Sequence, residues 1–135
     1  MINVTIRGVR PDDLDRVAEI ETACFPAAEA APREALEARI MTFPESFLVA
    51  EADGKMIGFI NGCVTNSPVI YDELFHDTGL HIPEGKNQTV FGLDVLPEYR
   101  KQGIAAKLMR QFIELARTHG RKRVVLTCKD RLVSY

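Results

Sequence analysis

The longest apolar pattern in the chain lies between Gln88 and His119. It opens with a run from Val90 to Leu96 that Pro97 ends, and so short a run indicates a strand rather than a buried helix. Beyond a basic turn, apolar residues recur at helical spacing on one broad face: Ile104, Leu108, Phe112 and Leu115, with Ala105, Met109, Ile113 and Ala116 alongside. Gly120 follows as the left-handed residue on which helices commonly end. The pattern therefore predicts a strand, a glycine-bearing turn and a long helix in succession.

Shorter patterns predict that strands and helices alternate before this point. Residues 4–7 alternate as an edge strand does, and Pro11 opens a helix that has acids in its first turn and runs to about Ala23. Pro32 starts a second helix. Asp53-Gly54 separates two apolar runs and is the strongest hairpin signal in the chain.

The remaining segments complete the expected α/β fold. Gly58 and Gly62 fall in the second strand of the hairpin, which indicates a close neighbour or a bulge. Residues 66–87 form an unusually long connection that is either functional or disordered, with a helical turn within residues 70–75. Residues 123–128 read as a last, β-branched strand, which Asp130 follows as a cap. These elements predict a mixed sheet flanked by helices.

Composition limits the class of protein. At 135 residues, the chain suits a single domain with a real core. No apolar run approaches the length of a membrane span and the N-terminus does not resemble a signal peptide, so we expect a cytoplasmic protein with no membrane partner. Cys24, Cys63 and Cys128 are odd in number and far apart, which predicts neither a disulfide framework nor a metal site. A net charge of −2 gives no general attraction for nucleic acid.

The turn before the long helix has the chemistry of an anion site. The first N–H groups of a helix have no partners within the helix and point outward. Gly103 would let the backbone approach a phosphate without a Cβ in the way, and Arg100 and Lys101 add positive charge. Neither the three-glycine dinucleotide pattern nor Walker A is present. The turn therefore favours a phosphate held by main-chain amides.

The stretch VLPEYRKQGIAAKLM, with its Arg-x-x-Gly-x-Ala core, resembles the coenzyme A-binding motif of the GNAT acetyltransferases. The resemblance implies the GNAT fold, a mostly antiparallel central sheet flanked by helices, with acetyl-CoA as co-substrate. Main-chain amides from Lys101 to Ala106 would wrap the pyrophosphate, and the strand would pair with the pantetheine arm. The implied cofactor-binding residues are Leu93, Asp94, Val95, Arg100, Lys101, Gln102, Gly103, Ile104, Ala105 and Ala106.

Three further stretches, residues 20–26, 72–85 and 128–133, resemble the arylalkylamine N-acetyltransferase branch of that family. This resemblance implies a small primary amine as acceptor. It implies also that Phe25, Pro26 and Phe91 shape the acceptor pocket, although a packed loop aromatic is an alternative role for Phe25. Acids in the long connection could attract a cationic acceptor, or could form a solvated loop face: Asp72, Glu73 and Asp77.

The chain departs from that branch at the positions of its catalytic groups. The two strand histidines proposed to serve as its base are replaced by Thr89 and Phe91. Tyr135 aligns with the aromatic residue before the family's proton-donating tyrosine. The last strands of the family sheet are absent as well, so residues 1–135 are expected to be an incomplete domain, or one that a second copy completes in a homodimer.

No catalytic residue is therefore assigned from the sequence. His76 and His81 are candidate bases because they lie in the long connection, but lone loop histidines are more often solvated. We expect an acetyl-CoA-dependent N-acetyltransferase whose small-molecule amine acceptor attacks the thioester directly. The alternative is a module that binds acetyl-CoA with little or no turnover. A nucleic-acid binder is disfavoured, because the basic run near residues 117–123 lacks interleaved aromatic side chains.

Overall fold

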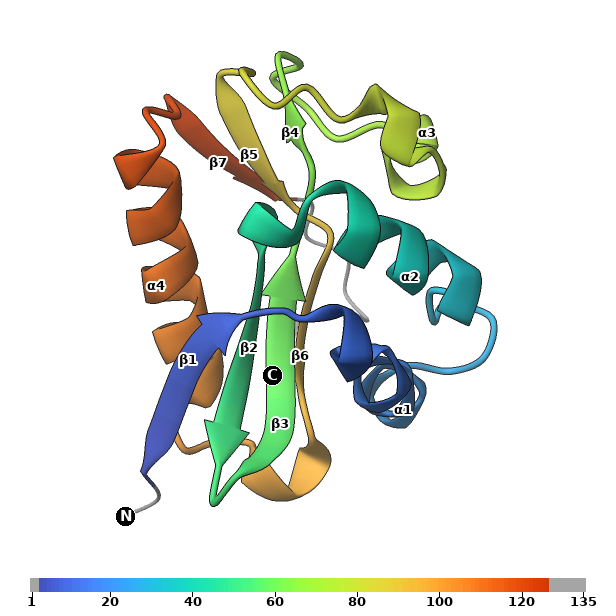
Figure 1. Ribbon diagram of the computed structural model, residues 1–135, viewed down its shortest axis with the longest axis vertical. Coiled ribbons are helices and arrows are strands. Elements are labelled where there is room, and N and C mark those ends of the chain that lie inside the picture. Colours follow the sequence, from blue (N-terminus) through green and yellow to red (C-terminus); the bar gives the residue numbers. More distant parts are fainter. Residues whose placement is uncertain (1–2, 127–135) are drawn as a thin grey trace.

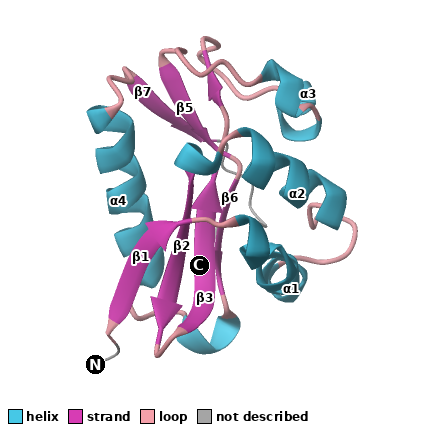
Figure 2. Cartoon of the chain, viewed as in Figure 1, coloured by secondary structure: helices cyan, strands magenta, loops and turns pink. Residues whose placement is uncertain are grey.

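A computed structural model of the chain describes residues 3–126 (Figures 1 and 2). The predictions for Cys128, Asp130 and Tyr135 lie outside the described residues. Four strands form one antiparallel sheet in the order β1-β2-β3-β6. Their bounds are Val4–Gly8 for β1, Phe47–Ala52 for β2, Lys55–Asn61 for β3 and Gly92–Val95 for β6.

A smaller sheet continues the first one in the order β4-β5-β7. Its strands are β4 (Val64–Thr65), β5 (Asn87–Val90) and β7 (Arg123–Leu126). β4 pairs antiparallel with β5, whereas β5 and β7 run parallel. The expected mixed, mostly antiparallel sheet is confirmed.

Helices cover both faces of the four-stranded sheet. Figure 1 shows α4 (Ile104–Thr118) on one side, and α1 (Leu14–Cys24) with α2 (Arg33–Thr42) on the other. The long connection holds α3 (Asp72–His76), close to its predicted helical turn. Short 3-10 turns stand at Pro11–Asp13, Pro44–Ser46, Thr78–Leu80 and Pro97–Tyr99.

The buried face of α4 follows the predicted spacing over its first three positions. Ile104, Leu108 and Phe112 are buried against the sheet, as is Ala116 from the same predicted face, whereas Leu115 is only half-buried. On the opposite face, Phe47 and Phe59 stack in the core with ring centroids 5.5 Å apart. Burial of the apolar face of α4 against the sheet, rather than helix propensity, is what stabilises this helix.

The hairpin turn has the geometry that its sequence predicts. Asp53 and Gly54 have positive φ angles of 54° and 75°. A two-residue turn with both central residues in this region matches the twist of the strands that it joins, and Asp-Gly is a favoured pair for it. β2 and β3 pair along their whole length on either side of the turn.

Gly58 and Gly62 mark the close approach that was predicted. A Cβ on Gly58 would lie 2.4 Å from the carbonyl oxygen of Asp94, and one on Gly62 would lie 2.0 Å from that of Thr89. Neither distance is compatible with a side chain unless the backbone moves. These two glycines therefore let the following strand pass close to β3.

The predicted strand from Val90 to Leu96 is wrong in its bounds. The structure has two strands, β5 and β6, separated at Phe91. Phe91 N–H donates to the carbonyl oxygen of Asn61, the residue that is also paired with Gly92, so two residues face one. Such a bulge turns a strand and ends its pairing. The chain thus passes from the smaller sheet into the larger one at this point.

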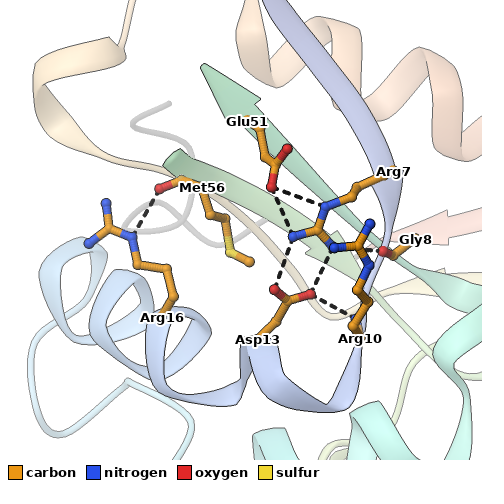
Figure 3. A network of polar contacts seen from close by, with 7 residues as sticks. All are labelled: Arg7, Gly8, Arg10, Asp13, Arg16, Glu51 and Met56. Carbon is orange, nitrogen blue, oxygen red and sulfur yellow. Dashed lines mark hydrogen bonds and ion pairs between the residues drawn. The ribbon is translucent and has the colours of Figure 1, made fainter. Parts of the chain in front are cut away.

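An ion-pair network anchors the start of α1 to the sheet (Figure 3). Arg7 on β1 contacts Asp13 with Nη1 at 2.8 Å and contacts Glu51 on β2 with Nη2 at 2.9 Å. Asp13 also accepts the N–H of Arg10 at 2.7 Å. Nearby, Arg16 Nε donates to the carbonyl oxygen of Met56 at 3.0 Å. Together these bonds join α1 to three strands.

Candidate functional site

The turn between β6 and α4 adopts a backbone shape that gathers amide groups. Lys101 has a φ angle of 65° and Gly103 one of 81°, on either side of Gln102. Left-handed residues alternating with ordinary ones direct successive N–H groups into one concavity that binds anions. A lysine in this region is strained, and such strain tends to be kept at functional sites.

The helix adds its own free amides to the turn. The first intrahelical bond runs from Lys107 N–H to the carbonyl oxygen of Gly103 at 3.0 Å, so the N–H groups of residues 104–106 have no acceptor within the helix. Gly103 serves as the N-cap, and a Cβ on it would meet no protein atom within 4 Å. Its open surroundings and positive φ both favour glycine. The turn and the helix start thus face open space together.

A pocket of about 330 Å³ lies at this place. It is lined by Leu93, Val95, Tyr99, Arg100, Lys101, Gly103, Ile104, Ala105, Ala106 and Met109. Eight of the ten residues expected to bind the cofactor are among them. Tyr99 and Met109 were not predicted, although Met109 stands on the predicted apolar face of the helix.

Two expected cofactor residues do not line the pocket. Gln102 is exposed in the turn. Asp94 is paired with Phe59 of β3, and its side chain is buried on the opposite face of β6. Because side chains alternate along a strand, Leu93 and Val95 face α4 while Asp94 faces α1 and α2. The side chain of Asp94 thus lies away from the pocket, and a part for Asp94 in binding the cofactor stays a prediction.

The edge of β6 that faces away from β3 presents main-chain groups. Leu96 N–H donates to Ile57 at 2.9 Å, and strand alternation then directs the polar groups of Asp94 to β3 and those of Leu93 and Val95 away from it. The Val95 carbonyl accepts two bonds at this edge, from Arg100 Nε at 3.0 Å and Cys24 Sγ at 3.4 Å. An extended ligand can pair with such an edge.

Cys24 is a hydrogen-bond donor here rather than a nucleophile. Burial raises the pKa of its thiol to about 11, and the negative charge of Asp94 adds to that shift. A thiol with so high a pKa is not ionised near neutral pH, and the thiolate is the reactive form of cysteine. Cys63 is buried, as expected for a small apolar side chain.

A buried polar cluster lies on the other face of β6. Its members are Glu21, Arg39, Asn61 and Asp94, which are at most 7% exposed. Burial raises the pKa of Asp94 well above its usual range, and Glu21 raises it further. Arg39 donates to Asn61 Oδ1 at 3.4 Å and to the Phe75 carbonyl at 3.2 Å. Its guanidinium carbon lies 4.9 Å from the centre of the Phe91 ring.

Phe91 borders this cluster, and Phe25 and Pro26 follow the helix that carries Glu21. Phe91 is half-buried and packs with Phe75, at 4.8 Å between ring centroids. Phe25 is half-buried and its N–H donates to Glu21 O at the end of α1, whereas Pro26 is exposed. The sequence did not predict the cluster, because acidic residues are rarely buried and its members are far apart along the chain.

The two candidate histidines differ from each other. His76 is exposed, and so are Asp72, Glu73 and Asp77. The side chain of His81 is 4% exposed, which corrects the expectation of a solvated loop histidine. Its Nδ1 accepts the N–H of Val64 at 3.0 Å, and burial lowers its pKa. His81 packs on Phe43, away from the pocket at α4, and supports the connection.

Across residues 3–126, no group of three or more histidine, cysteine, aspartate and glutamate side chains is placed to hold a metal ion. None of the described helices is long and apolar enough to cross a membrane.

Comparison with known proteins identifies the family. The sequence profile described as "Acetyltransferase (GNAT) family" matches residues 14–133. The chain belongs to this family. The structure also shows its mixed α/β fold, with the antiparallel sheet flanked by helices.

Two relatives from Bacillus subtilis (strain 168) resemble the chain over most of its length. One, "Uncharacterized N-acetyltransferase YkwB", is 32% identical over 125 residues, which are 83% of this chain and 54% of the relative. The other, "Probable hydrolase YhcX", is 29% identical over 133 residues, 91% of this chain and 25% of the relative. The chain thus spans between a quarter and about half the length of the curated relatives that it matches.

Solved structures share the fold. "GphF GNAT-like decarboxylase in complex with isobutyryl-CoA" has a TM-score of 0.84 and 30% identity, over 93% of this chain and 67% of that chain. A GNAT family acetyltransferase from Brucella melitensis in complex with acetyl-CoA has a TM-score of 0.64 and 22% identity, over 94% and 77% of the two chains. The 30% identity with GphF supports a family relationship, whereas the likeness to the Brucella melitensis structure shows the fold alone.

Proposed function

We propose that this GNAT chain transfers an acetyl group from acetyl-CoA to a small primary amine by direct attack. The observation that carries the proposal is the pocket in which the free amides at the start of α4 meet the open edge of β6. The anion site suits the pyrophosphate of acetyl-CoA, and the unpaired strand edge beside it suits the pantetheine arm. Complexes of family members with acyl-CoA support this choice.

Each part of the site would have its own role. The amides of Gly103 to Ala106 would hold the pyrophosphate, with Lys101 adding charge. Leu93 and Val95 would pair with the pantetheine arm, and Val95 N–H would polarise the thioester carbonyl. Arg100 would mainly stabilise the turn instead of contacting the cofactor, since its Nε donates to the Val95 carbonyl.

The acceptor would approach from the face of β6 that α1 and α2 cover. Phe91 lies beside Arg39 of the polar cluster there, and we propose that Phe91, with Phe25 and Pro26 from the loop after α1, shapes the acceptor pocket. The thioester is already reactive and the nucleophile belongs to the substrate, so most of the rate enhancement would come from positioning. An alkylamine has a pKa of about 10 and must lose a proton before it attacks.

A panel of small amines and peptides, scored for release of free CoA thiol, tests this function. We expect turnover of one or more small amines and none of peptide N-termini. Turnover of peptides alone would assign a different acceptor. Tight binding of acetyl-CoA without turnover of any amine would favour the alternative, a binding module.

A second function is favoured by the state of Arg39. This guanidinium is 6% exposed, and among the described residues no carboxylate lies within ion-pair distance of it. A carboxylate on the acyl group of a carboxyacyl-CoA could occupy that place, and the 30% identical GphF is a decarboxylase by its title. The bond between that carboxylate and the α-carbon would break, carbon dioxide would leave, and the α-carbon would take a proton. Mass spectrometry of malonyl-CoA incubated with the protein would reveal acetyl-CoA.

Association into a homodimer remains a prediction. β7 stands at an edge of the three-stranded sheet as far as the described strands extend, and an open edge can accept a strand from a second copy. Sedimentation velocity over a range of protein concentrations measures it. We likewise keep a cytoplasmic location as a prediction, which fractionation of the native cells would test.

A further inference from the structure

A second hollow lies at the end of α4, opposite the turn where this helix begins. It measures about 600 Å³ and is formed mainly by residues 83–86 of the long connection and residues 119–122 after α4. The two segments are joined where Lys122 N–H donates to the carbonyl oxygen of Lys86 at 2.6 Å. Figure 1 shows this end of α4 beside β7. The proposed acetyl transfer gives the hollow no role.

Arg121 has an unused hydrogen-bonding edge at this hollow, which its side chain lines. Its Nη1 donates to the carbonyl oxygen of Gly85 at 2.8 Å, but within residues 3–126 the buried Nε has no hydrogen-bond partner. A buried donor without an acceptor is costly, and most buried polar atoms have one. The N–H groups of Nε and Nη2 point the same way, as a fork that matches the two oxygens of a carboxylate. This edge of Arg121 is thus suited to an acceptor from outside the described chain.

His81 supplies a second unused donor behind the wall of the hollow. Its Nδ1 accepts the N–H of Val64 at 3.0 Å, so the proton of the neutral ring is on Nε2. Burial lowers the pKa of His81 and the charge of Arg121 lowers it further, which keeps the ring neutral near pH 7. Among the described residues Nε2 has no hydrogen-bond partner, and it lies 3.8 Å from Oε1 of Glu45, which lines the hollow. A nearly fully buried N–H therefore points at the hollow from the side of Glu45.

The charged side chains around the hollow indicate which kind of acceptor fits. Three positive side chains, Lys86, Arg121 and Lys122, face two negative ones, Glu45 and Glu84, which leaves one net positive charge. A single carboxylate matches that balance better than a phosphate, which brings more negative charge past the two acids. The Glu45 side chain is 53% exposed and can turn out to solvent, which would leave its place near the imidazole to the carboxylate of a ligand.

The end of α4 does little to oppose an anion here. The free carbonyl groups of a helix C-terminus would repel one. In this chain the carbonyl oxygen of Ala116 accepts the N–H of Arg121 at 3.0 Å, and that of Arg117 accepts the N–H of Gly120 at 3.0 Å. The turn after α4 thus satisfies these carbonyl groups itself, while it places the Arg121 side chain at the hollow.

We propose that this hollow is a second binding site, for a small molecule that bears a carboxylate, held by the Nε edge of Arg121 and by Nε2 of His81. The site is separate from the acetyl-CoA pocket and does not depend on the proposed function. Arg121 follows α4 and His81 belongs to the long connection, so a bound carboxylate would join these two parts of the chain. The exposed Lys86 and Lys122 at the rim favour a ligand with a second carboxylate.

Calorimetric titration of the chain with succinate tests the site without any turnover. We expect saturable binding with a Kd below about 1 mM. Gly103→Val should bind succinate as wild type does, because Gly103 lies at the other end of α4. Loss of binding in that variant would place succinate at the start of α4 and overturn the proposal. Absence of saturable binding to wild type would overturn it too, whether or not the protein transfers acetyl groups.

Two substitutions remove the donors while keeping their local contacts. His81→Asn leaves an acceptor in the place of Nδ1 but no donor at Nε2, and Arg121→Lys keeps the positive charge but lacks the fork. Each should weaken succinate binding about tenfold or more, because hydrogen bonds to a charged group are strong. The matched controls are His76→Asn and Arg117→Lys, at exposed positions of the same connection and of α4, and both should bind as wild type. Unchanged affinity in both donor variants would contradict the site.

Glu45→Gln should have the opposite effect, which a damaged fold would not produce. Removing this carboxylate takes a like charge away from the ligand, so succinate should bind about threefold more tightly. Nuclear magnetic resonance adds a readout on the wild-type chain: the side-chain N–H signals of Arg121 Nε and His81 Nε2 should shift as succinate is added. Binding that moves neither signal would overturn the assignment. Tighter binding of inorganic phosphate than of succinate at these two residues would overturn the choice of a carboxylate.

Discussion

Arg7 and Asp13 are joined by two parallel hydrogen bonds, from Nη1 to Oδ2 at 2.8 Å and from Nη2 to Oδ1 at 3.0 Å. This two-pronged geometry is the strongest form of a carboxylate contact. The Arg7 side chain is 18% exposed and that of Asp13 is 12% exposed, so solvent screens the pair only in part. The bond lowers the pKa of Asp13 and raises that of Arg7, as an ion pair formed on folding requires.

Replacing Asp13 should therefore change stability in a pH-dependent way. We expect Asp13→Asn to lower the free energy of unfolding by about 1–2 kcal/mol at pH 7. Because the folded pKa of Asp13 is lowered, its contribution is present above the unfolded value of about 4 and is lost as the pH falls through the folded value. Urea unfolding at pH 7 and pH 3 measures the difference. Asp15→Asn is the control, since that side chain is 84% exposed and should cost less than about 0.5 kcal/mol.

Gly103→Val should abolish or strongly weaken acetyl-CoA binding. The residue has a φ of 81° and its Cβ direction is free of protein atoms, so a side chain there would occupy ligand space and strain the turn. We expect at least a tenfold loss of affinity by calorimetry, with the fold retained. Gly120→Val is a close match, because Gly120 has a φ of 76° and open surroundings at the other end of α4. Equal affinity in the two variants would contradict the assignment of the turn.

Gly62→Ala should destabilise the protein without touching the pocket. Its Cβ would lie 2.0 Å from the carbonyl oxygen of Thr89, so the backbone of β5 must move. Overpacking of this kind typically costs about 1–3 kcal/mol, and we expect the upper end of that range because main chain is involved. Gly8→Ala is the control, since nothing lies within 4 Å of its Cβ. Thermal unfolding that shifts equally in both variants would count against the close contact.

Stability should also respond to pH through His81. Burial lowers its pKa, so the unfolded chain binds a proton that the folded chain resists, and stability falls as the pH drops below about 6.5. The raised pKa of Asp94 acts in the opposite direction, because the unfolded carboxyl ionises first as the pH rises. The informative quantity is thus the difference between wild type and His81→Gln, which should shrink between pH 7 and pH 5. His76→Gln, at an exposed position, should leave the profile unchanged.

Much of the fold was predictable because local chemistry and tertiary structure agree. Asp53-Gly54 demands a tight turn, and the spacing of Ile104, Leu108 and Phe112 demands a helix with one buried face. The glycine turn before α4 was predicted from the same kind of local pattern, a glycine followed by the start of a helix. These features depend on residues close together in the sequence, and no distant partner overrides them.

The break at Phe91 was not predictable, because the apolar pattern continues through it. Gln88 extends β5 in place of an apolar residue, and its buried amide donates to the carbonyl oxygens of Gly62 and Cys63. Such polar burial depends on a partner strand that periodicity does not reveal. The burial of Glu21 and Asp94 escaped prediction for the same reason, since one stands on a helix and the other on a distant strand.

The passage of the chain from β5 to β6 at Phe91 divides the backbone ladders of the described strands into two sets. Two sheets that share no backbone hydrogen bonds can open separately, at different free energies. In native-state hydrogen exchange, amides of Val49 and Phe59 should be released only by global unfolding, because they lie in the large apolar core. Amides of Gln88 and Val124 should be released by a smaller local opening. A protein with this division can loosen its smaller sheet while the large apolar core stays closed.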